Sequence, residues 1–197
     1  MHPTRLVLLL SVILLSCASS VAQQPGPQFW RKVGCEPFEP RTKLERLDEW
    51  YNTVTIKGFT RITTVEVRGV RIDAVEMRAL GSRDRAKGIV VSLREGGEQR
   101  PNENRAFVDY EELDALLNAI DAVSRVDESA TRLASFEAKY KTLGDLEVGV
   151  FRQTQRGTAV SLTTGICDRA TQTMTLDDLG KVKAMIQEAK TRLEELR

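Results

Sequence analysis

Histidine is almost absent from this chain, because the only one is His2. If the N-terminal segment is removed, as argued below, the mature protein has no histidine. That absence excludes Ser-His-Asp and Cys-His nucleophile systems and also histidine metal sites. Glycine-rich phosphate loops are missing too, since Gly96-Gly97 is not followed by the lysine and helix that a P-loop needs.

A net charge of either sign is also lacking. The chain has 29 basic and 28 acidic residues, for a formal net charge of +1. The predicted signal contains a single charged side chain, Arg5, so its removal leaves 28 of each and a net charge of zero. A neutral chain has no global field that would attract polyanions.

Cysteine is scarce, with three residues in the whole chain. Cys17 falls within the N-terminal segment, so Cys35 and Cys167 are the pair available for bridging. Two lone cysteines make no metal ligand set, and we expect no metal and no cofactor. In an oxidising compartment the pair is expected to form a disulfide, whose long loop the chain-entropy model values at about 4 to 5 kcal/mol. The alternative is two buried free thiols.

Long apolar runs are limited to LVLLLSVILL at residues 6–15. This run is shorter than the ~20 residues of a membrane-spanning helix but fits a secretory signal, with a buried first helix or strand as the alternative. A cut after Ala22 gives a signal of residues 1–22 and a periplasmic or secreted protein. The stretch Leu14-Leu15-Ser16-Cys17 resembles a bacterial lipobox, which gives a signal of residues 1–16, lipidation of Cys17 and anchoring to the outer membrane.

Residues 23–41 are predicted to be a tether or N-terminal segment, and residues 42–52 a short helix with the spacing of a capping box at Thr42 and Glu45. From residue 54 to 108, apolar and polar residues alternate as in strands. The alternation changes phase near Asp73, which predicts a β-bulge.

The remainder of the chain repeats this pattern. Residues 106–123 have the apolar spacing of a helix, with Asp109 as its N-cap. Residues 134–174 again alternate as strands, and a last amphipathic helix is predicted to follow Thr175 as its N-cap. The stretch GGEQRPNEN at residues 96–104 is predicted to be an exposed, flexible loop.

The two long helices begin alike, because residues 108–113 align with residues 174–179. In each half of the chain, about three strands are followed by a short strand, and the long helix comes directly after that short strand. The economical interpretation is a tandem ββββα repeat, with residues 42–126 as the first unit and residues 127–197 as the second. The fold class predicted is therefore α+β, with antiparallel sheets and two long helices. The alternative is that two unrelated amphipathic helices share caps and an apolar stripe.

Two resemblances follow from these motifs. VDYEELD at residues 108–114 and KYKTLGDLEVGVF at residues 139–151 resemble segments of small exported bacterial proteins of unknown function, over roughly residues 50–195. That resemblance implies a domain but no activity. The element order also resembles the Whirly type of single-strand-binding fold, in topology only, so no binding residues are carried over.

The function expected from these features is that of an exported, non-catalytic binding or structural module. Its partner would be a protein or an envelope component, bound through a free sheet face or the loop at residues 96–104. Membrane contact is expected only through a lipid anchor, and we expect no catalytic or cofactor-binding residue. One alternative is a hydrolase that uses carboxylates alone. The acids around Asp109 are otherwise explained as helix caps, since they lack the spacing of a calcium loop.

A third hypothesis is an anion-binding or nucleic-acid-binding sheet, because the first predicted sheet is locally basic. Its cationic residues are Lys57, Arg61, Arg68, Arg71, Arg78, Arg83, Arg85, Lys87, Arg94, Arg100 and Arg105. Aromatic residues for base stacking are few in this region, namely Phe59 and Phe107. A solvated charged face is therefore the favoured interpretation, and nucleic acid is not expected as a partner.

Overall fold

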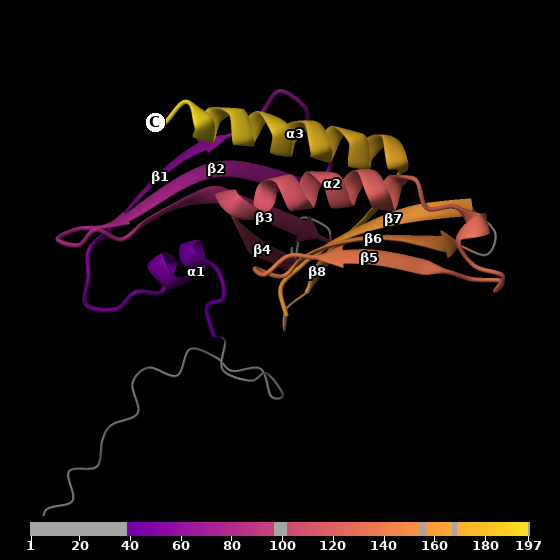
Figure 1. Cartoon of the computed structure of the whole chain (residues 1–197), viewed down its shortest axis with the longest axis horizontal. Helices are drawn as coiled ribbons and strands as arrows, with labels where there is room; N and C mark the ends of the chain where they lie inside the picture. The colour runs from indigo at the N-terminus through magenta and orange to yellow at the C-terminus, as the bar shows by residue number, and fades with distance from the viewer. Residues whose placement is uncertain (1–38, 97–101, 154–156, 167–168, 197) are drawn as a thin grey trace, which may run out of the picture. The chain divides into compact units, whose positions relative to one another are not determined.

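The computed structural model describes residues 39–96, 102–153, 157–166 and 169–196 (Figure 1). All of these belong to one compact unit, Cys35–Arg197. Cys17, Cys35 and Cys167 lie outside the described residues, as does most of the predicted N-terminal segment. Lipidation and the disulfide therefore stay predictions.

Two antiparallel four-stranded sheets make up most of the fold. Sheet A contains β1 (Thr55–Arg61), β2 (Val70–Ala79), β3 (Arg85–Glu95) and β4 (Asn102–Asp109), in that order. Sheet B contains β5 (Glu137–Lys141), β6 (Leu146–Gln153), β7 (Gly157–Thr164) and β8 (Ala170–Met174), also in chain order. The helices are α1 (Lys43–Asp48), α2 (Leu113–Ser124) and α3 (Leu176–Glu194), with short 3-10 turns η1 (Tyr110–Glu112) and η2 (Glu128–Ala130).

The α+β prediction is confirmed, and the two halves are similar sheet units, each followed by a long helix. That they form a true repeat stays a prediction. Two boundaries differ from expectation. Residues 102–104 of the predicted loop belong to β4, and α2 begins at Leu113, after η1, rather than directly after Asp109. No helix in the described ranges is long and apolar enough to span a membrane.

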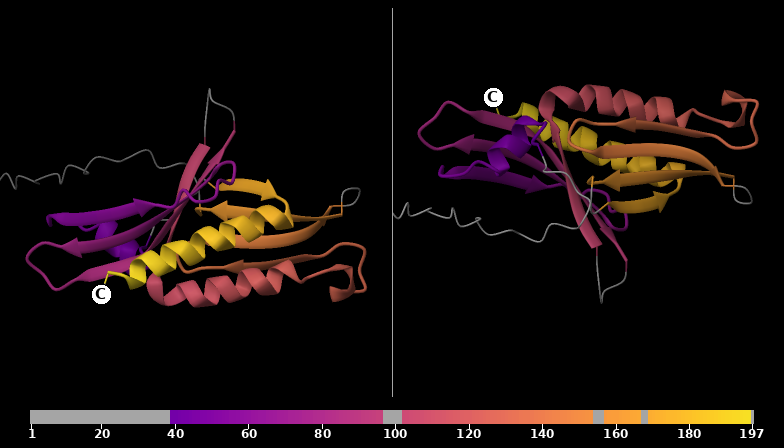
Figure 2. Two further views of the ribbon diagram at one scale, coloured as in Figure 1. Left: turned by 90° about the horizontal axis from the view of Figure 1, so that it is seen from above. Right: turned by 90° about the horizontal axis from the view of Figure 1, so that it is seen from below.

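Each long helix packs on the sheet of the other half. Helix α2 lies along β5 and β6 of sheet B, whereas α3 lies along β2 and β3 of sheet A (Figure 2). The two helices also contact each other. As a result, the halves share one hydrophobic core and neither sheet is covered by its own helix alone.

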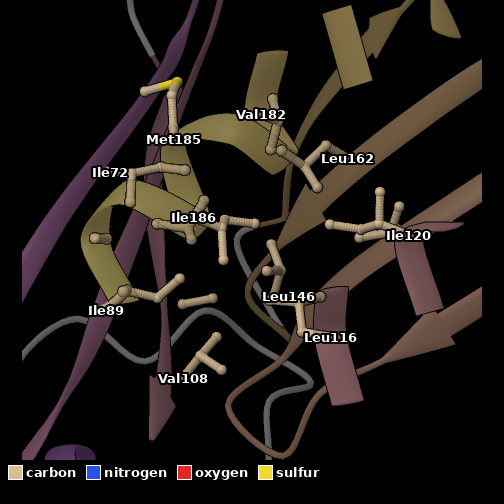
Figure 3. Packing of buried hydrophobic residues seen from close by; sticks show 14 of the residues in the cluster. Ile72, Ile89, Val108, Leu116, Ile120, Leu146, Leu162, Val182, Met185 and Ile186 are labelled. Atoms are coloured by element: carbon tan, nitrogen blue, oxygen red, sulfur yellow. The ribbon is translucent and has the colours of Figure 1, made fainter. Parts of the chain in front are cut away.

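This shared core contains side chains from both sheets and both long helices. Figure 3 shows Ile186 of α3 near Ile72 and Ile89 of sheet A, with Leu146 of sheet B close by. All four are at most 1% exposed. The apolar stripe predicted for the last helix is therefore buried at the junction of the two sheets.

A second, smaller core lies on the other face of sheet A, beneath α1. It consists of Leu44, Leu47, Val75, Met77, Ala79, Ala86, Val90 and Phe107. Strand β2 thus buries Ile72 and Ala74 on one face and Val75 and Met77 on the other. Its pairing with β1 and β3 is continuous through Asp73, so the predicted bulge is wrong. The change of phase arises because a strand covered on both faces carries apolar residues at successive positions.

Helix α1 is held on sheet A by hydrogen bonds at its N-terminus. Thr42 and Glu45 form the predicted capping box, although the helix ends at Asp48 rather than at residue 52. The Asp109 carboxylate accepts hydrogen bonds from the backbone N–H groups of Lys43 (2.8 Å) and Leu44 (3.1 Å). Asp109 precedes η1 in the chain but makes no side-chain capping bond there. Its carboxylate therefore caps α1 instead of the helix that follows it.

Candidate functional site

Part of sheet A is free on the face that carries α1. Side chains on this face follow from the strand register, which pairs Arg61 with Asp73, Asp73 with Val90 and Val90 with Phe107. The next row pairs Arg71 with Ser92 and Ser92 with Arg105. Helix α1 covers only the part of this face around Val75, Met77, Ala86 and Phe107. The area toward Arg61 and Arg71 is left to solvent.

A cavity of about 290 Å³ lies in this free area, and we call it the cationic pocket. Its lining residues are Lys57, Phe59, Arg61, Arg71, Asp73, Val75, Val90, Ser92 and Arg105. Four of these side chains are cationic, and they come from three different strands, β1, β2 and β4. The strand pairing is what brings them together, since they are up to 48 positions apart in the chain (57 to 105).

Carboxylates hold the cations in place at the base and rim of the pocket. The buried carboxylate of Asp73 accepts a hydrogen bond from Arg61 Nε at 3.2 Å and forms an ion pair with Arg71 Nε at 3.5 Å. Arg71 Nη2 also donates to Ser92 Oγ at 3.1 Å and to Glu103 at 3.0 Å. These contacts orient the two guanidinium groups. Each group has five N–H donors and uses only part of them, so donors remain for a ligand.

The other two cations share a partner and a ring. Asp48, the last residue of α1, pairs with Arg105 Nη2 at 2.7 Å and with Lys57 Nζ at 3.5 Å. Both cations lie over the ring of Phe107, with Lys57 Nζ 5.5 Å and Arg105 Cζ 5.1 Å from its centroid. The half-buried cations are therefore preorganised by α1 and by an aromatic floor.

The chemistry of this arrangement is that of anion binding. Arginine presents N–H donors in a planar fork that matches carboxylate, phosphate and sulfate oxygens. Within the described residues, neither Nη atom of Arg61 has a hydrogen-bond partner, and this side chain is 52% exposed. Ser92 is no candidate nucleophile, since it is 4% exposed and accepts a hydrogen bond from Arg71.

A larger cavity of about 950 Å³ lies along α1 and the segment that follows it. It is lined by Pro40, Lys43, Arg46, Leu47, Glu49, Trp50, Tyr51, Asp84 and Arg85. The cavity contains exposed side chains of both charges. It also borders Pro40, next to the N-terminal residues that the structure does not describe. Its lining does not indicate a particular ligand chemistry.

The acidic residues near α1 have structural partners. Glu112 is partnered only in part, because its Oε2 atom is buried without a hydrogen-bond partner among the described residues, and burial raises the pKa of its carboxyl group, with further contributions from Asp109 and Glu45. Its Oε1 atom accepts a hydrogen bond from the backbone N–H of Leu143 at 3.0 Å, which opposes that shift. Asp145 pairs with Arg41 and with Lys141. No cluster of three metal-ligating side chains occurs in the described ranges.

The predicted site residues and the observed pocket are different sets. Asp109 and Thr175 act at helix ends, and the Thr175 hydroxyl accepts a hydrogen bond from the N–H of Asp178 at 3.1 Å. The pocket cations all belong to the basic residues noted in the sequence, but that pattern favoured a solvated face. Only the register shows which of these cations share a face and surround one cavity.

Comparison with protein-family models, with curated proteins and with solved structures returned no match. The site is therefore interpreted from its own geometry.

Proposed function

We propose that this protein is a non-catalytic binding module whose cationic pocket binds an anionic group of a protein or an envelope component. The observation that carries the proposal is the convergence of Lys57, Arg61, Arg71 and Arg105 on one cavity of about 290 Å³. That volume lies at the lower end of the about 300 to 1,000 Å³ of small-molecule sites, which leaves room for an anionic group and the atoms next to it. The anion would accordingly be one group on a larger partner.

The composition of the pocket favours such a group over single-stranded nucleic acid. Nucleic-acid sheets stack successive bases on several aromatic side chains. Phe59 is the one exposed aromatic among the described residues that line the pocket. Its ring, 65% exposed, is available for apolar contact beside the charged group.

We further propose that the protein is exported, either as a soluble chain beginning at Gln23 or as a lipoprotein beginning at Cys17, with Cys35 and Cys167 joined. The apolar run at residues 6–15 and the small residues after it support export. An intact mass of the protein from a bacterial host tests this proposal. A mass for Gln23–Arg197 less two hydrogens, or for a triacylated chain from Cys17, would support it. The mass of the uncut chain would refute it.

The pocket is tested by binding to two immobilised polyanions, heparin for sulfate groups and poly-glutamate for carboxylates. We expect retention on at least one of them at low salt, and elution as salt screens the contacts. The variant Lys57→Gln/Arg61→Gln should elute at lower salt than the parent. The matched control is Arg78→Gln/Arg83→Gln, which removes the same charge from exposed positions outside the pocket lining. Equal shifts for both variants, or no retention of the parent, would refute the proposal.

A further inference from the structure

Strand β1 is an exposed edge of sheet A. In the described part of the chain it pairs with β2 alone, whereas the opposite edge, β4, forms an isolated bridge between Phe107 and Gly144, in the turn between β5 and β6. Every residue of β1 after Thr55 is exposed. Figure 2 shows β1 at the outer edge of its sheet, away from sheet B. Long exposed edges of this kind are templates for pairing with another chain.

Apolar side chains gather around this edge. Four of the large exposed hydrophobic residues in the described ranges lie on β1 or beside its start: Val54, Ile56, Phe59 and Leu80. Leu80 belongs to this group because its N–H donates to the carbonyl of Val54 at 2.8 Å. Gathered apolar side chains on a monomer surface are typical of an interaction site.

The backbone groups that point away from β2 can be identified from the pairing. Ile62 N–H donates to Ile72, and Leu80 N–H donates to Val54, so even-numbered residues of β1 form the hydrogen-bonded pairs with β2. In an antiparallel pair these alternate with non-bonded pairs. The outward N–H and C=O groups are therefore those of Thr55, Lys57, Phe59 and Arg61.

We propose that β1 pairs antiparallel with β1 of a second copy about a two-fold axis at Gly58, joining two copies of sheet A. This register places outward-facing residues opposite one another, as antiparallel hydrogen bonding requires. The opposed pairs would be Thr55 with Arg61, Ile56 with Thr60 and Lys57 with Phe59 of the second copy. The proposal goes beyond the ligand of the cationic pocket, although Lys57, Phe59 and Arg61 of this edge also line that pocket.

Charge selects this register over its neighbours. A shift by two residues in one direction would set Lys57 opposite Lys57 of the second copy, and a shift in the other would set Lys57 opposite Arg61. Like charges directly opposite each other destabilise a strand pair. In the proposed register each Lys57 instead faces an aromatic ring, that of Phe59.

Gly58 supports a close approach of a second backbone. A glycine within a strand weakens it and often marks a bulge or the close approach of another chain. The pairing of β1 with β2 has no bulge, and a Cβ atom at Gly58 would meet only Glu76 O, at 3.9 Å. Packing within the described chain therefore does not require glycine here.

The first test is the molar mass by sedimentation over a concentration series, using protein purified after expression of the full chain. We expect twice the chain mass for the parent and the single-chain mass for Phe59→Lys, which sets the new lysine opposite Lys57. The control Leu133→Lys removes another exposed apolar side chain, one that is 75% exposed and lies outside sheet A, and should leave the dimer intact. The double variant Lys57→Glu/Phe59→Lys should restore the dimer, since the proposed register then pairs opposite charges.

The second test is cross-linking. Two Gly58→Cys residues would face each other at the ~4.5 Å Cα separation of a non-bonded antiparallel pair, within disulfide range. Thr60→Cys is the control, because its two copies would lie roughly 13 Å apart along the strands. A covalent dimer for Gly58→Cys, above the level in the parent and absent for Thr60→Cys, is expected. A parent that stays a monomer at all concentrations, or a dimer unaffected by Phe59→Lys, would overturn the proposal.

Discussion

Replacing Ile186 by alanine tests whether the two halves of this protein share one core. Ile186 is 1% exposed on α3 and lies between side chains of sheet A and Leu146 of sheet B (Figure 3). Large-to-alanine changes in cores cost about 2 to 5 kcal/mol, depending on how well the site can collapse. Hydrogen-bonded strands border this position, so the surroundings have little freedom to close the cavity. We therefore expect a loss in the upper half of that range, about 3 to 5 kcal/mol.

This loss is a large fraction of the ~5 to 15 kcal/mol by which native domains are stable. For a chain of this size, 1 kcal/mol shifts the melting temperature by about 2 to 4 °C, so a decrease of roughly 6 to 20 °C is expected. The measurement is thermal unfolding followed by circular dichroism, with Gln187→Ala as an exposed control on the same helix. Gln187→Ala should change the melting temperature little.

Hydrogen exchange would locate the effect of Ile186→Ala. Because both sheets pack on the same core, backbone amides of β2 and of β6 should lose protection by the same free energy. A loss confined to β2, with β6 unchanged, would mean that sheet B is stable without this contact. Two separate melting transitions would refute the shared core as well.

Two further predictions concern local features. A Cβ atom at Gly144 would lie 1.9 Å from the carbonyl oxygen of Phe107, whereas nothing lies within 4 Å at Gly180 in α3. Gly144→Ala should therefore lower the melting temperature, and Gly180→Ala should raise stability by about 0.4 to 1 kcal/mol; equal effects would contradict this reasoning. Burial raises the pKa of Glu112, so its ionisation costs stability as pH rises from the unfolded to the folded pKa. Glu112→Gln stays neutral at every pH, so it should raise the melting temperature at pH 7 relative to the parent. This gain should shrink toward pH 4, because more of the parent's Glu112 is then protonated. A gain in melting temperature that does not change with pH would contradict this reasoning.

Local sequence patterns were enough to predict most elements of this fold. The apolar stripe of α3 and the alternation in β5 to β8 each report burial within a few residues, so they predict the type of element directly. The capping box at Thr42 was equally local, since its two side chains are three residues apart. Asp109 shows where such reasoning fails, because its carboxylate binds the N-terminus of α1, 65 residues earlier, and not the turn that follows it.

The sequence by itself determined that this chain forms strand-rich α+β halves with amphipathic helices, because periodicity records which side chains must leave water. Tertiary structure alone decided which sheet each helix covers, since an apolar stripe fits either sheet equally well. It also decided that Lys57, Arg61, Arg71 and Arg105 surround one cavity. Their common face depends on the strand register, and a register shifted by one residue would move a whole strand's side chains to the opposite face.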